Sequence, residues 1–130
     1  MYVVDTNTLI CFFKGIGKVP EKFLKISPKE IGIPAVVLYE LEYGIAKSTS
    51  PRKRRAQLKE LSSLVEILPF ESEAAKFSAS IRVSLEKKGT PIGPHDILIA
   101  GTALANQGIL VTNNTKEFSR VPKLKLDNWY

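Results

Sequence analysis

The stretch Tyr2-Val3-Val4-Asp5-Thr6-Asn7 decides the fold class, because a short apolar run ends abruptly on a carboxylate. Carboxylates are disfavoured inside strands and are costly to bury without a partner. At the carboxyl end of a buried parallel strand, however, an acid lies where α/β proteins place their functional groups. We therefore interpret Val3 and Val4 as a short buried strand that ends at Asp5.

The rest of the chain alternates further short apolar runs with amphipathic segments. Strands are predicted at residues 31–33, 65–68, 109–111 and 124–126, and helices at 6–13 (capped by Thr6 or Asn7), 19–26, 35–48, 52–64, 71–88 and 95–107. Strands separated by helices pair in parallel, so we expect an α/β fold with a central, mostly parallel sheet of four to five short strands flanked by helices. No linker or repeat divides the chain, which predicts one domain over residues 1–130.

Composition narrows the class of protein. The formal net charge is +6, and a basic surplus is typical either of a well-dissolved protein or of one that binds a polyanion such as nucleic acid. The single Cys11 rules out an internal disulfide and fits a reducing compartment. No apolar run is long enough for a membrane span and no signal peptide is recognisable, so we expect a cytoplasmic protein without membrane contact.

Two further regions place acids beside apolar residues. Asp96 opens the predicted helix 95–107 with an apolar face at i+3, i+4 and i+7, so its carboxylate is expected to point inward, with simple helix capping as the alternative. Helix 35–48 carries Glu40 and Glu42, both with apolar neighbours, so periodicity leaves open which acid faces inward. The same helix is apolar nearly all round, which predicts burial on several sides.

Inward carboxylates at neighbouring strand ends repel one another and require cations. Oxygen ligands without His or Cys partners suit Mg²⁺ or Mn²⁺. Such an ion can hold a phosphodiester and activate a water for its hydrolysis. Together with the basic charge, this pattern favours nucleic-acid hydrolysis.

Four stretches carry a family resemblance: VVDTNTLI at 3–10, IPAVVLYELEYGI at 33–45, GTPIGPHDILIAGTALANQGILVTNNTKEF at 89–118, and the ending DNWY. In this order and at these separations they resemble the PIN-domain ribonucleases, specifically the VapC toxins of toxin–antitoxin pairs. The resemblance implies a PIN-like fold with an acidic Mg²⁺ site, in which Mn²⁺ can substitute. Its acids fall on Asp5, on Glu40, four residues before a glycine, and on Asp96.

The resemblance also marks one departure. Many members carry a fourth acid two residues after the Thr of the "LVT" motif, where this chain has Asn114, and Glu117 lies close enough in sequence to substitute. Residues expected to orient the metal ligands or the substrate are Thr6, Asn7, Thr112, Asn113 and Asn114. The run Arg52, Lys53, Arg54 and Arg55 is expected either to form a solvated helix face or to bind RNA phosphates. Trp129 and Tyr130 are expected to pack against the last strand rather than to stack on RNA bases.

The resulting hypothesis is a Mg²⁺-dependent endoribonuclease toxin that hydrolyses RNA, with tRNA as a candidate target, by metal-activated water. The resemblance implies a cognate VapB-like antitoxin as partner. Part of the apolar surface of helix 35–48 is expected to form a homodimer interface or to receive an antitoxin helix. An alternative is a non-catalytic RNA-binding PIN module, which Asn114 motivates. A phosphotransfer domain is disfavoured, because position 7 is Asn where an aspartyl phosphatase needs Asp, and because no early acid pair is present.

Overall fold

Strand β1 (Tyr2–Val4) lies at the centre of a five-stranded sheet in the computed structural model, which describes residues 1–130. The strand order is β3-β2-β1-β4-β5, and every neighbouring pair is parallel. The remaining strands are β2 (Ile31–Pro34), β3 (Glu66–Leu68), β4 (Ile109–Val111) and β5 (Lys125–Asp127). The predicted α/β class is confirmed, and the sheet is parallel throughout.

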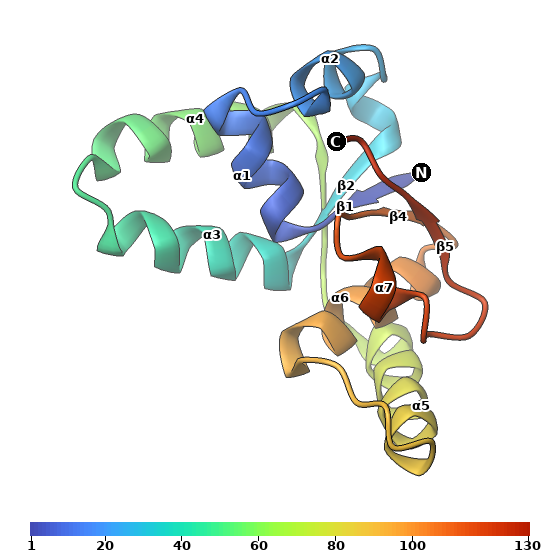
Figure 1. Cartoon of the computed structure of the whole chain (residues 1–130). Helices are drawn as coiled ribbons and strands as arrows, with labels where there is room; N and C mark the ends of the chain where they lie inside the picture. Colours follow the sequence, from blue (N-terminus) through green and yellow to red (C-terminus); the bar gives the residue numbers. More distant parts are fainter.

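Helices connect the consecutive strands and cover both faces of the sheet (Figure 1). Their bounds are α1 (Thr6–Lys14), α2 (Val19–Leu24), α3 (Ala35–Lys47), α4 (Pro51–Leu64), α5 (Ser72–Lys87), α6 (Pro94–Ala105) and the single turn α7 (Thr115–Phe118), with a 3-10 turn η1 (Pro28–Glu30) before β2. Helices α1, α3 and α4 lie on one side of the sheet, while α5 and α6 lie on the other (Figure 1). None of the helices combines the length and the apolar character that a membrane crossing requires.

The strand order fixes where a site can form. The chain builds β2 and β3 on one side of β1, then crosses back to place β4 and β5 on the other side. The amide of Asp5 donates to the carbonyl of Val111 (3.2 Å), and the amide of Thr112 donates to the carbonyl of Asp127 (2.9 Å). The residues that follow β1, β4 and β5 therefore share one edge of the sheet, at the crevice where open α/β sheets bind their ligands.

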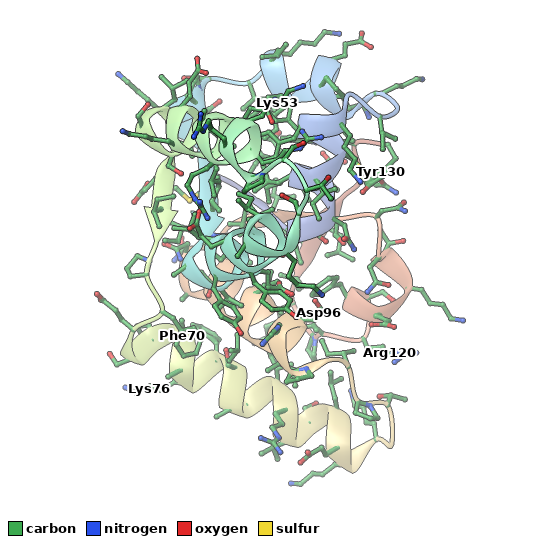
Figure 2. The ribbon with its side chains drawn as sticks, turned by 90° about the vertical axis from the view of Figure 1, so that its left-hand side faces the viewer. Lys53, Phe70, Lys76, Asp96, Arg120 and Tyr130 are labelled. Carbon is green, nitrogen blue, oxygen red and sulfur yellow. The ribbon has the colours of Figure 1, made fainter.

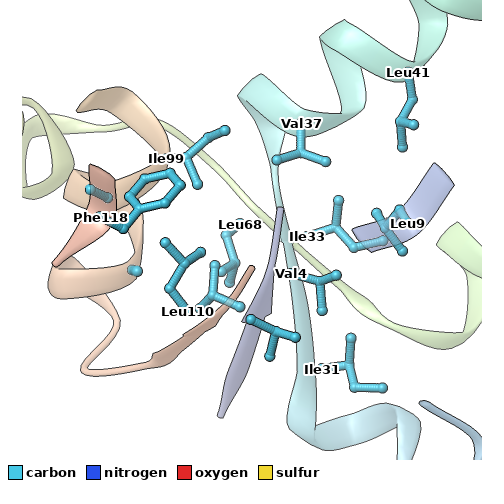
Figure 3. Close-up of a cluster of buried hydrophobic side chains, with 14 of the residues drawn as sticks. Val4, Leu9, Ile31, Ile33, Val37, Leu41, Leu68, Ile99, Leu110 and Phe118 are labelled. Atoms are coloured by element: carbon cyan, nitrogen blue, oxygen red, sulfur yellow. The ribbon is translucent and has the colours of Figure 1, made fainter. Parts of the chain in front are cut away.

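Two apolar layers hold the helices to the sheet. Leu9, Ile33 and Val37 pack on the side of α1 and α3, whereas Ile99 and Phe118 pack on the side of α6 and α7, and all five are essentially fully buried (Figure 3). Burial of side chains of this size contributes about 1.5–3 kcal/mol each before the entropy cost of folding is subtracted. The sheet edge is thus built on a rigid scaffold.

One sequence expectation about the helices is wrong. The cap of the first helix is Asp5, whose carboxylate accepts from the amide of Thr8 at 3.0 Å, and not Thr6 or Asn7. Within the single chain, helix α3 is buried on one side and exposes Tyr39 and Tyr43, each to 59%, on the other. Its apolar side chains include aromatic rings that face solvent, which a count of apolar residues cannot distinguish from core.

The last residues of the chain fold back onto the sheet. Trp129 is buried between Tyr2 and Phe23, with ring centroids 5.6 Å and 5.8 Å away, and its indole N–H donates to Asp127 Oδ2 at 3.1 Å. The expectation that Trp129 packs at the end of the last strand is therefore confirmed.

Helices α5 and α6 approach closely at Gly101, which generates a stability prediction. A Cβ at Gly101 would lie 1.9 Å from Ser78 Oγ and 2.9 Å from the backbone of Ala74 and Ser78, so Gly101→Ala should lower the free energy of unfolding by about 1–3 kcal/mol through overpacking. Gly44, inside α3, has no atom within 4 Å of the same position, so Gly44→Ala should raise it by about 0.5–1 kcal/mol. Urea denaturation of both variants checks the opposite signs, and equal effects would contradict the close packing.

Candidate active site

Asp5 is the most buried acid of the molecule, with only 5% of its surface exposed. Burial raises the pKa of its carboxyl group, while hydrogen bonds from the Thr112 side chain and from Thr8 act in the opposite direction. The nearby charge of Glu40 raises the pKa further. The carboxylate is therefore held in a fixed position at the end of β1, with its charge only partly compensated.

Asp96 lies in the first turn of α6 and faces other acids. The residue before this helix is Gly93, and no side chain caps the helix, so the capping alternative does not describe Asp96. Burial, followed by the charges of Asp5, Glu117 and Glu40, raises the pKa of Asp96 to about 6. The carboxylate is close enough to these acids for their charges to act on it.

Glu40 and Glu42 have different environments, which periodicity could not separate. Glu40 is half-buried, and its Oε1 accepts from the hydroxyl of Thr6 at 2.7 Å. His95 Nδ1 lies 3.4 Å from its other carboxylate oxygen, and the His95 ring meets Tyr39 edge-on at 5.7 Å. Glu42 is exposed, so α3 presents Glu40 and not Glu42 to the acidic cluster, by which we mean Asp5, Glu40, Asp96 and Glu117.

Asn114, which stands where many family members carry an acid, makes two defined hydrogen bonds. Asn114 donates from Nδ2 to Glu117 Oε2 at 3.1 Å, and its own amide donates to Thr112 Oγ1 at 2.9 Å. The charge of Glu117 in turn raises the pKa of Asp96. Asn114 therefore orients Glu117, and the short helix α7 brings a fourth carboxylate to the cluster from a position three residues later.

Other residues singled out in the sequence lie at the rim or elsewhere. Asn7 is exposed, and exposed Asn113 accepts from Asn128 Nδ2 at 3.3 Å. Arg54 donates to the carbonyl of Phe13 at 3.2 Å and to Gln57 at 3.0 Å, so its guanidinium joins α4 to the end of α1. The other three cations of that run, Arg52, Lys53 and Arg55, are exposed or partly exposed.

Two residues behind Asp5 are missed by sequence reasoning. The interpretation of Asp5 as a strand end overlooks the hydrogen bond from the amide of Thr8, although a carboxylate three residues before the donating amide has the usual spacing of a helix cap.

Tyr130 lies against Cys11, whose Sγ is 3.1 Å from the phenol oxygen. Burial, this contact and the charge of Asp5 raise the pKa of Tyr130 above its usual range. No local pattern links residues 119 positions apart.

A cavity of about 250 Å³ adjoins the acidic cluster. It lies between α1, α3 and α4, and its lining joins apolar side chains to Glu40 and two cations: Ile10, Phe13, Leu41 and Ile45, with Lys14 and Arg54. The cavity therefore offers an apolar space with one acid at its boundary.

The acidic cluster can be tested for its fit to a metal ion. As the side chains stand, no group of three or more His, Cys, Asp or Glu residues could hold an ion directly. Magnesium, however, usually binds through one or two carboxylates and keeps several waters. No Lys or Arg pairs with these acids, because the ion pairs of the chain are Lys25–Glu21, Arg82–Glu86 and His95–Glu40. An all-oxygen cluster without a Lys or Arg partner fits a hydrated divalent cation.

Comparison with known proteins agrees with this geometry. Residues 2–124 match the family model of the PIN domain. Ribonuclease VapC2 of Rickettsia felis is 40% identical over 99% of this chain and 98% of its own length. The tRNA(fMet)-specific endonuclease VapC of Salmonella typhimurium is 34% identical over 98% of this chain and 97% of its own length.

A solved structure extends the likeness to three dimensions. The crystal structure of VapBC2 from Rickettsia felis bound to a promoter DNA fragment contains a chain that superposes with a TM-score of 0.92 at 35% identity, covering 99% of this chain and 98% of that one. The chain therefore belongs to the PIN-domain family and, within it, to the VapC ribonucleases of toxin–antitoxin pairs.

Proposed function

We propose that this ribonuclease is the toxin of its pair and hydrolyses RNA phosphodiester bonds with Mg²⁺ as cofactor. The observation that carries the proposal is the convergence of Asp5, Glu40, Asp96 and Glu117 from four different elements onto one edge of the sheet. Burial, followed by the charges of the other three acids, raises the pKa of Asp96 in agreement with this arrangement. Carboxylates gathered in this way, without a Lys or Arg partner, are typical of sites that bind a divalent cation. The names of the relatives supply the substrate class, RNA.

In this proposal the residues of the chain prepare the ion site and the substrate. Asp5 and Asp96 hold the ion, assisted by Glu40 and, at a second position, by Glu117. Bound Mg²⁺, which Mn²⁺ can replace, neutralises phosphate charge and lowers the pKa of the attacking water. Thr8 fixes Asp5 through its amide, Thr6 fixes Glu40 through its hydroxyl, and Asn114 fixes Glu117.

The proposed products are a 5′-phosphate and a 3′-hydroxyl, which follow when water attacks phosphorus and the 3′ oxygen leaves. Transfer RNA is the proposed substrate, because relatives in Salmonella typhimurium and Shigella flexneri are named tRNA(fMet)-specific endonucleases. Mapping the cleavage products of total RNA, with wild type against Asp5→Asn, identifies the target.

The proposed protein partner is a VapB-like antitoxin, since the solved relatives include VapBC complexes. The cavity between α1 and α3 is the surface that would serve inhibition best, because Glu40 forms part of its wall. An apolar segment seated there would place its neighbours over the acidic cluster and exclude RNA.

Two observations favour a second candidate, a non-catalytic RNA-binding module. The cluster holds no direct three-ligand arrangement, and Asn114 occupies the usual place of an acid. Such a module would bind RNA without cleaving it and would not bind Mg²⁺ at millimolar concentration. Calorimetric titration with Mg²⁺ or Mn²⁺ separates the two candidates.

Removal of a proposed metal ligand should abolish cleavage. Asp5→Asn and Asp96→Asn each remove a charge at nearly constant volume, and we expect Mg²⁺-dependent RNA cleavage to fall about a hundredfold or more. Glu42→Gln is the matched control, because Glu42 is exposed on the same helix as Glu40 and should leave the rate unchanged. Full activity in either Asn variant would refute the assignment.

Burial of Asp96, together with repulsion from the neighbouring acids, predicts an unusual dependence of stability on pH in protein kept metal-free with EDTA. The folded-state pKa of Asp96 is about 6, above an unfolded value near 3.9, so the folded state binds more protons between these values. The free energy of unfolding should therefore fall as pH rises from about 4 to about 6 and stay low above that range.

The same raised pKa predicts how Asp96→Asn changes the free energy of unfolding. Asp96→Asn should reduce this slope and raise the free energy of unfolding at pH 8 by about 1–3 kcal/mol. Asp5, whose pKa is also raised, keeps part of the slope in the variant. Urea titrations at several pH values measure the effect, and an unchanged curve would show that Asp96 is not repelled by its neighbours.

Glu117 can be tested separately from the other acids. Glu117→Gln removes the charge but keeps an oxygen that can accept from Asn114, so we expect metal affinity to fall about tenfold with the local structure intact. Calorimetry with Mn²⁺ measures the change, with exposed Glu71→Gln as the control. Unchanged affinity and stoichiometry would mean that Glu117 has no part in metal binding.

A further inference from the structure

Helix α4 begins with an arrangement of charge that opposes its own dipole. Its first turns carry Arg52, Lys53, Arg54 and Arg55 directly after Pro51, and the first turn contains no acid. The N-terminus of a helix is its positive end, so cations there are unfavourable. Helices α5 and α6 instead place Glu73 and Asp96 in their first turns. The sequence of α4 therefore concentrates positive charge at a cost to the helix.

Only one of these cations has a partner within the chain. Arg54 is bound to Phe13 and Gln57, as described above. Arg52, Lys53 and Arg55 are accessible to solvent and take part in none of the three ion pairs of the molecule, and the same holds for Lys59 one turn later. Arg52, Arg55 and Lys59 line an open hollow whose remaining wall is Pro51 and Ala56. The hollow thus gathers three unpaired cations around a small apolar floor.

An exposed face of α3 leads from Glu40 toward the tip of the hairpin whose second helix carries the hollow. Helices α3 and α4 form this hairpin, which projects from the sheet (Figure 1). Glu40, Tyr43 and Lys47 follow one another at i, i+3 and i+7, so Lys47 lies on the same face about 10 Å from Glu40. Tyr43 is 59% exposed, and Lys47 Nζ lies 4.9 Å from its ring centroid. Figure 2 views this hairpin end-on, with Lys53 on α4 and Asp96 beyond α3.

We propose that this basic surface, formed by Lys47, Arg52, Lys53, Arg55 and Lys59, binds the phosphate backbone of the RNA at nucleotides away from the scissile bond. The proposal rests on the proposed ribonuclease function and adds where its substrate is held. The acidic cluster repels phosphates, so affinity for RNA has to come from cations elsewhere on the molecule. Unpaired Arg and Lys side chains supply such affinity by releasing counterions from the RNA.

The central test compares two variants with equal loss of charge. The hairpin variant is Arg52→Gln/Arg55→Gln/Lys59→Gln, and the control is Lys76→Gln/Lys87→Gln/Lys88→Gln, whose exposed lysines lie on or directly after α5 on the other side of the sheet. Binding of a tRNA-sized RNA is measured in EDTA, where cleavage does not occur. We expect the hairpin variant to bind about tenfold or more weakly, with a salt slope smaller by about 2, and the control to stay close to wild type.

A second arm uses substrate length. With Mg²⁺ present, the hairpin variant should show a raised KM and an unchanged kcat on the long RNA, because the cations do not touch the reacting phosphate. A dinucleotide, whose only phosphodiester is the scissile one, leaves no phosphate for the basic surface and should be cleaved by variant and wild type with the same KM. Equal weakening of both triple variants, or an equal effect on the dinucleotide, would overturn the proposal.

Two further measurements separate loss of RNA contacts from loss of folding. The hairpin variant should melt at the same or a higher temperature than wild type, because repulsion at the start of α4 is relieved. The charge-conserving Arg52→Lys/Arg55→Lys variant should retain RNA binding. A hairpin variant that loses affinity only for an acidic protein partner would overturn the proposal and assign the surface to that partner. If wild type cleaves no RNA at all, the proposed function fails; if it cleaves and the hairpin variant binds normally, only this inference fails.

Discussion

The structure depends on one carboxylate that serves two purposes. Asp5 ends β1, caps α1 through the amide of Thr8, and stands beside the other acids at the carboxyl edge of the sheet. Its amide is bound to Val111, so the strand pairing that builds the sheet also fixes the position of the charge. A burial this deep is tolerable because the Thr8 amide and the Thr112 hydroxyl satisfy part of the carboxylate. The only buried acid of the fold and the proposed centre of its chemistry are therefore the same group.

Negative and positive charges lie in separate regions of the molecule. The acids gather where the strands end, and cations without partners gather at the tip of the α3–α4 hairpin. A polyanion that approaches the molecule is attracted by the tip of the α3–α4 hairpin and repelled by the acidic cluster, until cations bind at that cluster. If the proposed metal dependence holds, this arrangement would make productive binding of RNA conditional on the metal, whereas the net charge of +6 alone would attract nucleic acid without any such condition.

The sequence was sufficient for the class of fold and for the acids that lie next to strand ends, because the apolar run before Asp5 and the alternation of strands with helices are local patterns. Periodicity failed for Glu40 and Glu42, since Tyr39 and Tyr43 count as apolar and yet face solvent. The family resemblance, and not periodicity, pointed to Glu40. The proximity of Glu117 to Asn114 in the sequence suggested that Glu117 could supply the fourth acid, and the hydrogen bond between them depends on the single turn of α7. The contact of Cys11 with Tyr130 joins opposite ends of the chain and has no local signal.

The two roles of Asp5 affect what happens when a mutation inactivates such a toxin in a population that benefits from losing its toxicity. Replacement of Asp5 by a residue that cannot cap a helix, such as Ala or Val, removes the cap together with the charge, so the inactive product is expected to fold less well and to be degraded. A substitution at Asp96 removes a repelled charge and disturbs no cap, so its inactive product is expected to persist at full abundance. A persistent, harmless copy would still occupy the antitoxin. Inherited loss of toxicity through Asp96 would therefore alter the balance of the pair, whereas loss through Asp5 would simply remove one member.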